Sequence, residues 1–259
     1  MYETQYFKQQ DGSKIAYKNL EPHNPEDIKN EISLVLIIGL WSVKEEFIGL
    51  EEELAKSQKG YVVSSDDPIS LDLMAQDTIA LIKHLEIKKF NLFGWSMGGC
   101  ISFYIALNIP SDLKLEKLII CSSSIRLPTP SAFFNTIYDL PKPPEPLKNV
   151  QEQKDLIMNA FEKCFTDYML ENPEILDKLA KIQFNSNRPF EIFKRQWEAL
   201  KGIDIVSKTQ MIKTTTLLLY GEADEMLPIT EGEFIANAIP NLKFIRIPKS
   251  RTYVLANNS

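Results

Sequence analysis

The stretch LFGWSMGGCIS, residues 92–102, decides the fold of this chain. It follows an apolar run typical of a strand and precedes one typical of a helix, and glycines at 94, 98 and 99 surround Ser96. A strand that turns sharply into a helix needs small residues there, because neighbouring backbones approach closely. The G-x-S-x-G pattern at such a turn is typical of a strained serine that acts as a nucleophile. A plain turn whose serine only caps the helix is the alternative.

Outward from this turn, strand-like and helix-like stretches alternate through the first half of the chain. A hairpin is expected around the turn at Asp11 and Gly12. Aliphatic runs typical of buried strands alternate with amphipathic helical patterns, and short segments connect them. This order predicts an α/β fold with a mostly parallel sheet and helices on both faces. The strand-like runs are 32–40, 61–63, 89–94 and 115–123, and the helical patterns are 43–58, 68–84 and about 97–108.

Residues 124–205 have a different character. They begin with a proline-rich segment, expected to be irregular, and continue with helix-like stretches. The best marked is NPEILDKLAKIQ, where Asn172 is placed to cap the helix and Pro173 to begin it. Strand-like runs then resume at 214–221 and 243–248. The sequence therefore predicts a core made of residues 1–123 and 206–259, with a helical insertion at 124–205.

Composition excludes several classes of function. The 259 residues carry a formal net charge of −6 and no basic stripe, which argues against nucleic acid as a partner. The longest apolar run, near 34–41, is too short to span a membrane, and the N-terminus lacks the apolar core of a signal peptide, so a cytoplasmic protein is expected. Cys100, Cys121 and Cys164 have unrelated spacings typical of buried side chains. No metal site and no cofactor are indicated.

Four features together resemble the α/β-hydrolase superfamily, in particular the AB hydrolase-1 type with a helical cap inserted after the sixth strand. They are GWSMGG (94–99), LIIGLW (36–41), LLLYGEADEMLP (217–228) and the cap-like insertion. The resemblance implies that Ser96 is the nucleophile and Asp224 the acid of a catalytic triad. It also implies an oxyanion hole formed by the backbone N–H groups of Leu40 and Met97. The alternatives are a plain turn at Leu40 and an acidic helix cap at Asp224.

The general base is missing from this pattern. His84 ends the helix that precedes the strand at 89–94, so we expect it at the opposite end of that strand, roughly 15–20 Å from Ser96. His23 precedes the strand that begins near Ile32 and is expected at the same far edge. The superfamily carries its histidine shortly after the last strand, where this chain has Arg251 and Thr252. Thr252 marks a degenerate histidine position, since neither side chain is a general base near neutral pH.

Three interpretations remain open at the level of sequence. The first is a serine hydrolase acting weakly on a carboxylic ester or related acyl substrate. The second is a non-catalytic pseudo-hydrolase that binds a small apolar ligand or a protein partner. The third is a truncated or spliced form of an active hydrolase. Aromatic residues of the insertion form an apolar roof in one interpretation and simple helix packing in another, and no oligomeric state is indicated. These residues are Phe133, Phe134, Phe190, Phe193 and Trp197.

Overall fold

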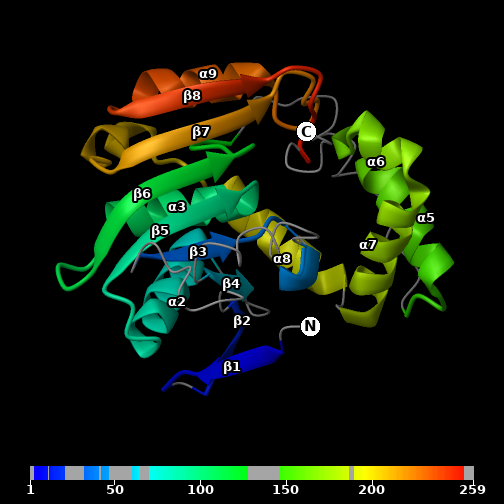
Figure 1. The fold of residues 1–259 in the computed structure, drawn as a ribbon, viewed down its shortest axis with the longest axis horizontal. Coiled ribbons are helices and arrows are strands. Elements are labelled where there is room, and N and C mark those ends of the chain that lie inside the picture. Colours follow the sequence, from blue (N-terminus) through cyan, green and yellow to red (C-terminus); the bar gives the residue numbers. More distant parts are fainter. Residues whose placement is uncertain are drawn as a thin grey trace, which may run out of the picture.

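One twisted sheet organises the molecule (Figure 1). The computed structural model describes residues 3–10, 12–20, 32–40, 42–46, 60–64, 70–127, 146–186 and 190–253. In this part of the chain the strand order is β1-β2-β4-β3-β5-β6-β7-β8. The strands are β1 (Thr4–Lys8), β2 (Lys14–Leu20), β3 (Ser33–Ile37), β4 (Gly60–Ser64), β5 (Lys89–Trp95), β6 (Lys114–Cys121), β7 (Thr215–Gly221) and β8 (Leu242–Ile247).

The sheet is mostly parallel, as the sequence predicted. Strands β4, β3, β5, β6, β7 and β8 run parallel to one another, and β2 joins β4 in antiparallel orientation. Strands β1 and β2 form the expected antiparallel hairpin, with Gly12 at a φ of 91° that favours glycine in the turn. The predicted α/β fold class is therefore confirmed.

Three described helices, α2 (Leu71–His84), α3 (Met97–Leu107) and α9 (Ile229–Ala238), pack on one face of the sheet. Alternate strand residues, such as Phe90, Leu92 and Leu118, are fully buried beneath them. A second cluster on the opposite face contains Leu36 and Phe93. The helix predicted at 43–58 begins with a short 3-10 helix, η2 (Lys44–Glu46), and the rest of that prediction lies outside the described residues.

A group of helices lies beyond the carboxyl ends of the parallel strands, on the side to which the strand arrows point in Figure 1. Helix α7 begins at Pro173, the position that the sequence predicted. The proline-rich segment lies mostly outside the described residues. The helices of this group, with the segment that leads back to the sheet, are α5 (Val150–Phe161), η3 (Glu162–Cys164), α6 (Asp167–Glu171), α7 (Pro173–Ser186), α8 (Phe190–Lys201) and η4 (Val206–Met211).

A charged contact ties the beginning of this helical segment to the core. Arg126 donates from Nε and Nη2 to the two carboxylate oxygens of Glu231 on α9, at 3.3 and 3.1 Å. Its guanidinium group also lies 3.7 Å from the centre of the Phe234 ring. Glu231 is only 4% exposed, so this bidentate pair satisfies a carboxylate that would otherwise be buried without a partner.

Candidate active site

Ser96 lies at the sharp turn between β5 and α3, with a φ of 53° and a ψ of −121°. This backbone conformation is strained for a residue with a side chain and persists only where surrounding contacts hold it. Its N–H donates to the carbonyl of Cys121 at 2.9 Å. Its own carbonyl accepts from the N–H of Gly99 at 2.9 Å and from the Ser123 hydroxyl at 2.8 Å. Hydrogen bonds to the neighbouring strand β6 and to helix α3 therefore hold this turn in place.

Glycine is needed around Ser96 because neighbouring backbone segments lie too close together to leave room for a side chain. A Cβ on Gly94 would lie 2.4 Å from the carbonyl oxygen of Gly98, and one on Gly98 would lie 2.2 Å from that of Ile37. In the turn after β3, a Cβ on Gly39 would meet the Cβ of Ser96 at 3.2 Å. The turn at Gly39 and the turn at Ser96 are thus packed directly against each other.

Both candidate oxyanion donors lie beside this turn. Met97 is the first residue of α3, so its N–H has no acceptor within the helix. Leu40 follows Gly39 in the turn after β3. Leu40, Ser96 and Met97 all line the same cavity. The structure therefore brings together, at one cavity, three of the residues that the sequence singled out.

The cavity lies between the sheet and the inserted helices. Leu40, Trp95 and Met97 contribute from the core side, and Ile157, Phe161, Trp197 and Leu200 contribute from α5 and α8. Phe193 is buried in the main core, which favours packing over ligand contact for that residue. Phe133, Phe134 and the side chain of Phe190 lie outside the described part of the structure. Of the five aromatic residues that the sequence singled out, Trp197 lines the cavity, together with aliphatic and aromatic neighbours that the sequence did not single out.

Asp224 and Thr252 contact each other directly. The Thr252 hydroxyl donates to Oδ1 of Asp224 at 2.7 Å, and the backbone N–H groups of Met226 and Leu227 donate to the same oxygen at 3.0 and 2.9 Å. Both side chains are buried, at 5% and 2% exposure. Thr252 also lines the cavity that contains Ser96. Thr252, which the resemblance marks as a degenerate histidine position, thus donates a hydrogen bond to the carboxylate of the candidate acid, Asp224.

Burial raises the pKa of the Asp224 carboxyl from 3.8 to about 6, because water is excluded from the charged form. Hydrogen bonds from Leu227, Thr252 and Met226 oppose part of that rise. The second oxygen, Oδ2, is buried and accepts no well-formed hydrogen bond from the described residues, although the nearby Ser122 hydroxyl also lowers the pKa. A buried carboxylate with one unpartnered oxygen costs stability at neutral pH.

Replacing Asp224 with Asn should stabilise the protein at pH 8 by on the order of 2 kcal/mol. The native carboxyl has a higher pKa than the unfolded one, so folding takes up a proton between about pH 4 and pH 6. Stability of the wild-type protein therefore falls as the pH rises through this window, and asparagine has no charge to bury. Urea unfolding at pH 8, 6 and 4 should show the advantage of Asp224→Asn shrinking towards zero.

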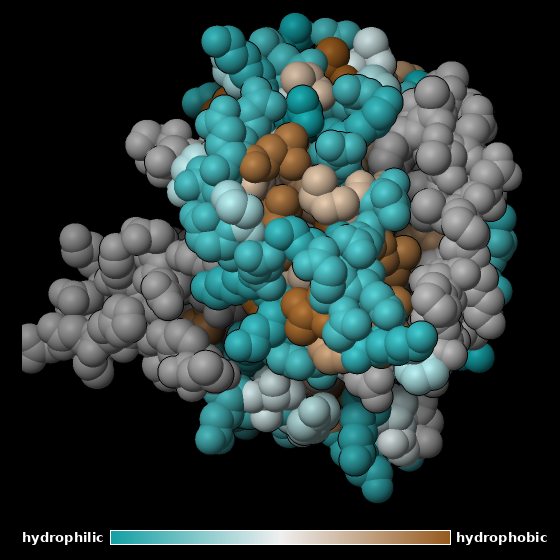
Figure 2. All heavy atoms as spheres, turned by 90° about the vertical axis from the view of Figure 1, so that its right-hand side faces the viewer, coloured by the Kyte–Doolittle hydropathy of each residue, from teal (hydrophilic) through white to brown (hydrophobic). Residues whose placement is uncertain are grey.

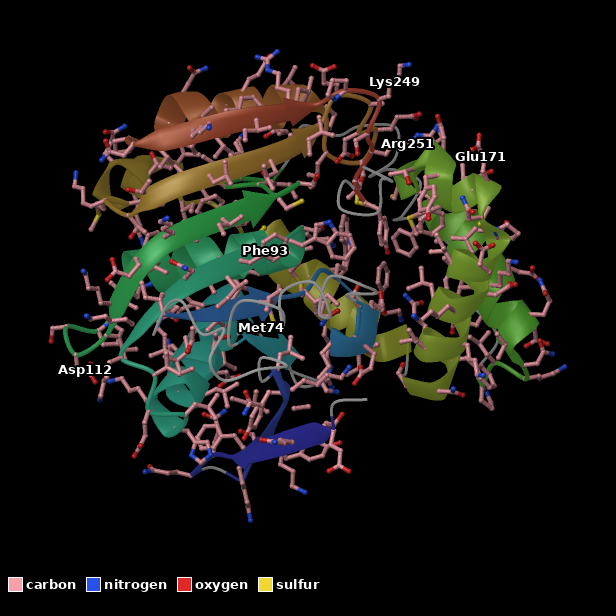
Figure 3. All side chains as sticks on the ribbon, in the orientation of Figure 1. Met74, Phe93, Asp112, Glu171, Lys249 and Arg251 are labelled. Atoms are coloured by element: carbon pink, nitrogen blue, oxygen red, sulfur yellow. The ribbon has the colours of Figure 1, made fainter. Side chains whose placement is uncertain are left out.

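A matched control for this pH dependence is Asp112→Asn. Asp112 is half exposed at the far end of the sheet (Figure 3), and the Lys83 ammonium 3.1 Å away lowers the pKa of its carboxyl. Because that shift has the opposite sign, Asp112→Asn should gain no stability at pH 8. An Asp224→Asn advantage that stays constant from pH 8 to pH 4 would contradict the burial argument.

His84, the histidine that the structure describes, does not supply a base beside Ser96. His84 ends α2 and stacks on Phe7 of β1, with ring centroids 4.3 Å apart. The cavity contains no histidine among the described residues that line it. His23 lies outside the described residues.

The segment that carries Thr252 is held by contacts that the sequence did not reveal. The Trp95 indole N–H donates to the carbonyl of Thr252 at 3.0 Å, and the rings of Trp95 and Tyr253 meet edge to face. Arg251, labelled near α6 in Figure 3, donates to the carbonyl of Phe165 at 3.1 Å and pairs with Asp167 at 3.4 Å. The only sequence signal for these roles was adjacency, since Trp95 precedes Ser96 and Arg251 and Tyr253 flank Thr252.

Within the described ranges, no group of three or more His, Cys, Asp or Glu side chains is arranged to hold a metal ion. No helix in those ranges has both the length and the apolar character needed to cross a membrane.

Comparison with known proteins gives one family match. The model of the family described as "alpha/beta hydrolase fold" matches residues 55–258. Among curated proteins, the chain is 24% identical over 173 residues to 3-oxoadipate enol-lactonase 2 of Acinetobacter baylyi, covering 66% of this chain and 60% of that protein. It is 33% identical over 148 residues to a pimeloyl-[acyl-carrier protein] methyl ester esterase of Wigglesworthia glossinidia brevipalpis, covering 55% of this chain and 54% of that one. The matches thus span less than two thirds of these relatives.

Solved structures share the fold over nearly the whole chain. An esterase from Exiguobacterium antarcticum superposes with a TM-score of 0.79 at 16% identity, covering 98% of this chain and 94% of the esterase. The enol-lactonase from Burkholderia xenovorans LB400 gives a TM-score of 0.76 at 19% identity, with 96% and 93% covered. At these identities the likeness concerns the fold alone.

Proposed function

This chain belongs to the alpha/beta hydrolase fold family, and on that premise we propose that it is a serine hydrolase of a carboxylic ester or related acyl substrate. In this proposal Ser96 attacks the acyl carbonyl. The backbone N–H groups of Leu40 and Met97 stabilise the oxyanion, and Asp224 is the retained acid. Residues 124–205 form a cap over the site. Curated relatives named as a lactonase and a methyl ester esterase support an ester-type substrate.

The observation that carries the proposal is the backbone of Ser96. A serine at a positive φ costs about 1–3 kcal/mol, and such strain persists where the surrounding structure over-determines it. A helix cap does not require this conformation, since capping serines adopt extended backbone angles. Ser70 at the start of α2 illustrates the difference, with a φ of −157° and a hydroxyl that accepts from Leu73. Ser96 makes no such capping bond.

We expect turnover to be slow because Thr252 stands beside Asp224 where a base is needed. Its hydroxyl neither takes up a proton near neutral pH nor leaves Oδ1 of Asp224 free for another donor. In a well-studied serine protease, removal of the triad histidine lowers turnover by about 10⁶-fold, while oxyanion stabilisation and binding retain about 10³- to 10⁴-fold over water. The present site keeps the serine but lacks a base, so we expect its turnover to lie only modestly above that residual level.

A non-catalytic member of the same family is the second candidate. The 2.7 Å hydrogen bond between Thr252 and Asp224 favours it, because it engages Oδ1 of the acid within the chain and leaves the apolar cavity free to bind a ligand. In that case the cavity holds a small neutral apolar molecule and Ser96 has no covalent role.

We also propose that the protein resides in the reducing environment of the cytoplasm. Cys100, Cys121 and Cys164 are all free and buried, which supports a compartment where disulfides do not form.

The function is tested by comparing wild-type protein with Ser96→Ala. If Ser96 is the nucleophile, a fluorophosphonate should label the wild-type protein stoichiometrically and leave the variant unlabelled. Hydrolysis of p-nitrophenyl acetate should fall about tenfold in the variant, to the level that the oxyanion donors and the cavity sustain without a nucleophile. The variant should stay folded, because alanine keeps the Cβ that packs against Gly39.

Ser102→Ala is the matched control for this comparison. Ser102 lies on α3, is fully buried, and donates to the carbonyl of Gly98 at 2.7 Å away from the cavity lining. Its loss should leave labelling and hydrolysis unchanged. Equal, background-level rates and no labelling in wild-type protein and Ser96→Ala would reject the hydrolase and retain the non-catalytic candidate.

A further inference from the structure

The described residues that line the cavity beside Ser96 include no charged side chain. Its walls are mostly aliphatic and aromatic, and no Asp, Glu, Lys or Arg is among the described residues that form them. A ligand group with a formal charge would lose its water here without gaining a counter-ion. The described walls therefore favour a neutral ligand.

One residue of the inserted helices breaks the apolar pattern with a carboxamide. Gln183, in the last turn of α7, lines the cavity together with Ile157 and Phe161 of α5. Among the described lining residues it is the only Asn or Gln. On the outer surface, the face that Figure 2 presents is largely hydrophilic, with apolar residues in small groups.

The orientation of the Gln183 carboxamide is set by a second glutamine. Gln153 on α5 is 4% exposed, and its Nε2 donates to Oε1 of Gln183 at 3.1 Å. On the outer side of the same helix pair, Lys154 pairs with Asp177 at 2.6 Å and holds α5 against α7. With Oε1 of Gln183 engaged by Gln153, the Nε2 group is the part of the carboxamide that retains hydrogen-bond donors for a ligand.

From this arrangement we propose that Gln183 is a specificity residue, whose Nε2 binds a carbonyl or hydroxyl oxygen carried on the acyl chain of a neutral substrate. This inference rests on the proposed function in one respect, because it places the scissile carbonyl at Ser96. The bound oxygen is then a second one, distal to the ester. The substrate class is a neutral oxo- or hydroxyacyl ester.

The expected preference arises from the free-energy cost of leaving the Nε2 group of Gln183 without an acceptor in an apolar wall. A plain alkyl chain would cover the Gln183 amide and remove its water without replacing the hydrogen bond. A chain with an acceptor at the right distance restores that bond. Sites that bind a ligand oxygen therefore discriminate against the analogue that lacks it, here by about five- to tenfold in Kd.

The test uses binding to the Ser96→Ala protein, so that hydrolysis plays no part. Trp95 and Trp197 line the cavity and report binding by fluorescence. The ligands are ethyl hexanoate, ethyl 4-oxohexanoate, ethyl 5-oxohexanoate and monoethyl adipate, which carries a carboxylate at the distal end. At least one oxo ester should bind about five- to tenfold more tightly than ethyl hexanoate, and monoethyl adipate should bind most weakly.

Two further variants separate recognition by Gln183 from a structural role. In the Ser96→Ala background, Gln183→Leu should abolish the preference for the oxo ester while ethyl hexanoate binds at least as tightly as before, which also shows that the cavity is intact. Lys154→Ala removes the ion pair with Asp177 between α5 and α7 and should leave the preference unchanged. Equal binding of all neutral esters, a preference that survives Gln183→Leu, or no binding of any ester would overturn the inference.

Failure of the proposed function gives a different result. If the chain is not a hydrolase, wild-type protein and Ser96→Ala show equal background hydrolysis, yet the oxo-ester preference and its loss in Gln183→Leu persist. If only the present inference fails, Ser96-dependent hydrolysis persists with no discrimination between plain and oxo esters.

Discussion

The variant Thr252→His should hydrolyse p-nitrophenyl acetate about 100-fold faster than the wild-type protein. A positioned general base accelerates proton transfer by roughly 10²- to 10⁴-fold, and the other parts of the proposed machinery are already in place. The Thr252 hydroxyl lies 2.7 Å from Oδ1 of Asp224, so a histidine there would have its Nδ1–H acceptor at hand. Initial rates across pH 5 to 9 measure the gain, which should require the neutral imidazole and so rise with pH.

A histidine at position 252 has space for its larger side chain only on the side that faces the cavity. Thr252 is 2% exposed but lines the cavity, so an imidazole ring would extend into the cavity towards the wall that holds Ser96. Arg251 should be left unchanged, because its contacts with Phe165 and Asp167 fix the segment against the inserted helices. An Arg251→Gly change would remove these contacts while adding nothing to the base.

Three controls identify the origin of any gain. Adding Ser96→Ala to Thr252→His should return the rate to background. Adding Asp224→Asn should remove most of the gain, because asparagine lacks the negative charge that stabilises the imidazolium and its amide group can hold the ring in the wrong tautomer. Thr252→Val, which loses only the hydroxyl, should show no gain. A folded Thr252→His protein with wild-type rates would mean that the oxyanion donors at Leu40 and Met97 are not positioned for catalysis.

Much of the fold follows from local patterns in the sequence. The aliphatic run at 32–40 predicts a buried strand, and the glycines around Ser96 predict a tight turn after a second strand. The structure places these two strands, β3 and β5, side by side in parallel register. Pro173 begins α7 because proline lacks the N–H that a first helical residue leaves unused. These predictions depend on neighbours in sequence and were therefore available before the structure.

The contacts that define the candidate site are long-range, and sequence patterns do not encode them individually. The Trp95 indole bond to Thr252 spans 157 positions, and the Gln153–Gln183 pair joins two helices. The position of Thr252 was inferred from the superfamily's histidine site, but its hydrogen bond to Asp224 depends on side-chain geometry at the ends of two strands. Gln183 gave no signal, because one glutamine on an amphipathic helix is normally a surface residue.

Gly98→Ala should destabilise the protein by about 3 kcal/mol, which corresponds to a drop in Tm of roughly 8 °C for a chain of this size. The added Cβ would lie 2.2 Å from the carbonyl oxygen of Ile37 and 2.7 Å from that of Ile38. Both are backbone atoms next to the carboxyl end of β3, so no side chain can rotate to make room. Relief requires α3 to move away from β3, which would also separate the Met97 and Leu40 donors.

Gly202→Ala is the matched control for this effect, because the same methyl group is added where there is space. Gly202 is exposed at the end of α8, and its added Cβ would meet only the carbonyl of Ala199, at an ordinary 3.6 Å. Its Tm should change by no more than about 2 °C, in line with a surface substitution. If thermal unfolding shows similar values for both variants, the contact between α3 and β3 is looser than these distances imply. The strain at Ser96 would then lack the rigid support on which its proposed role as nucleophile depends.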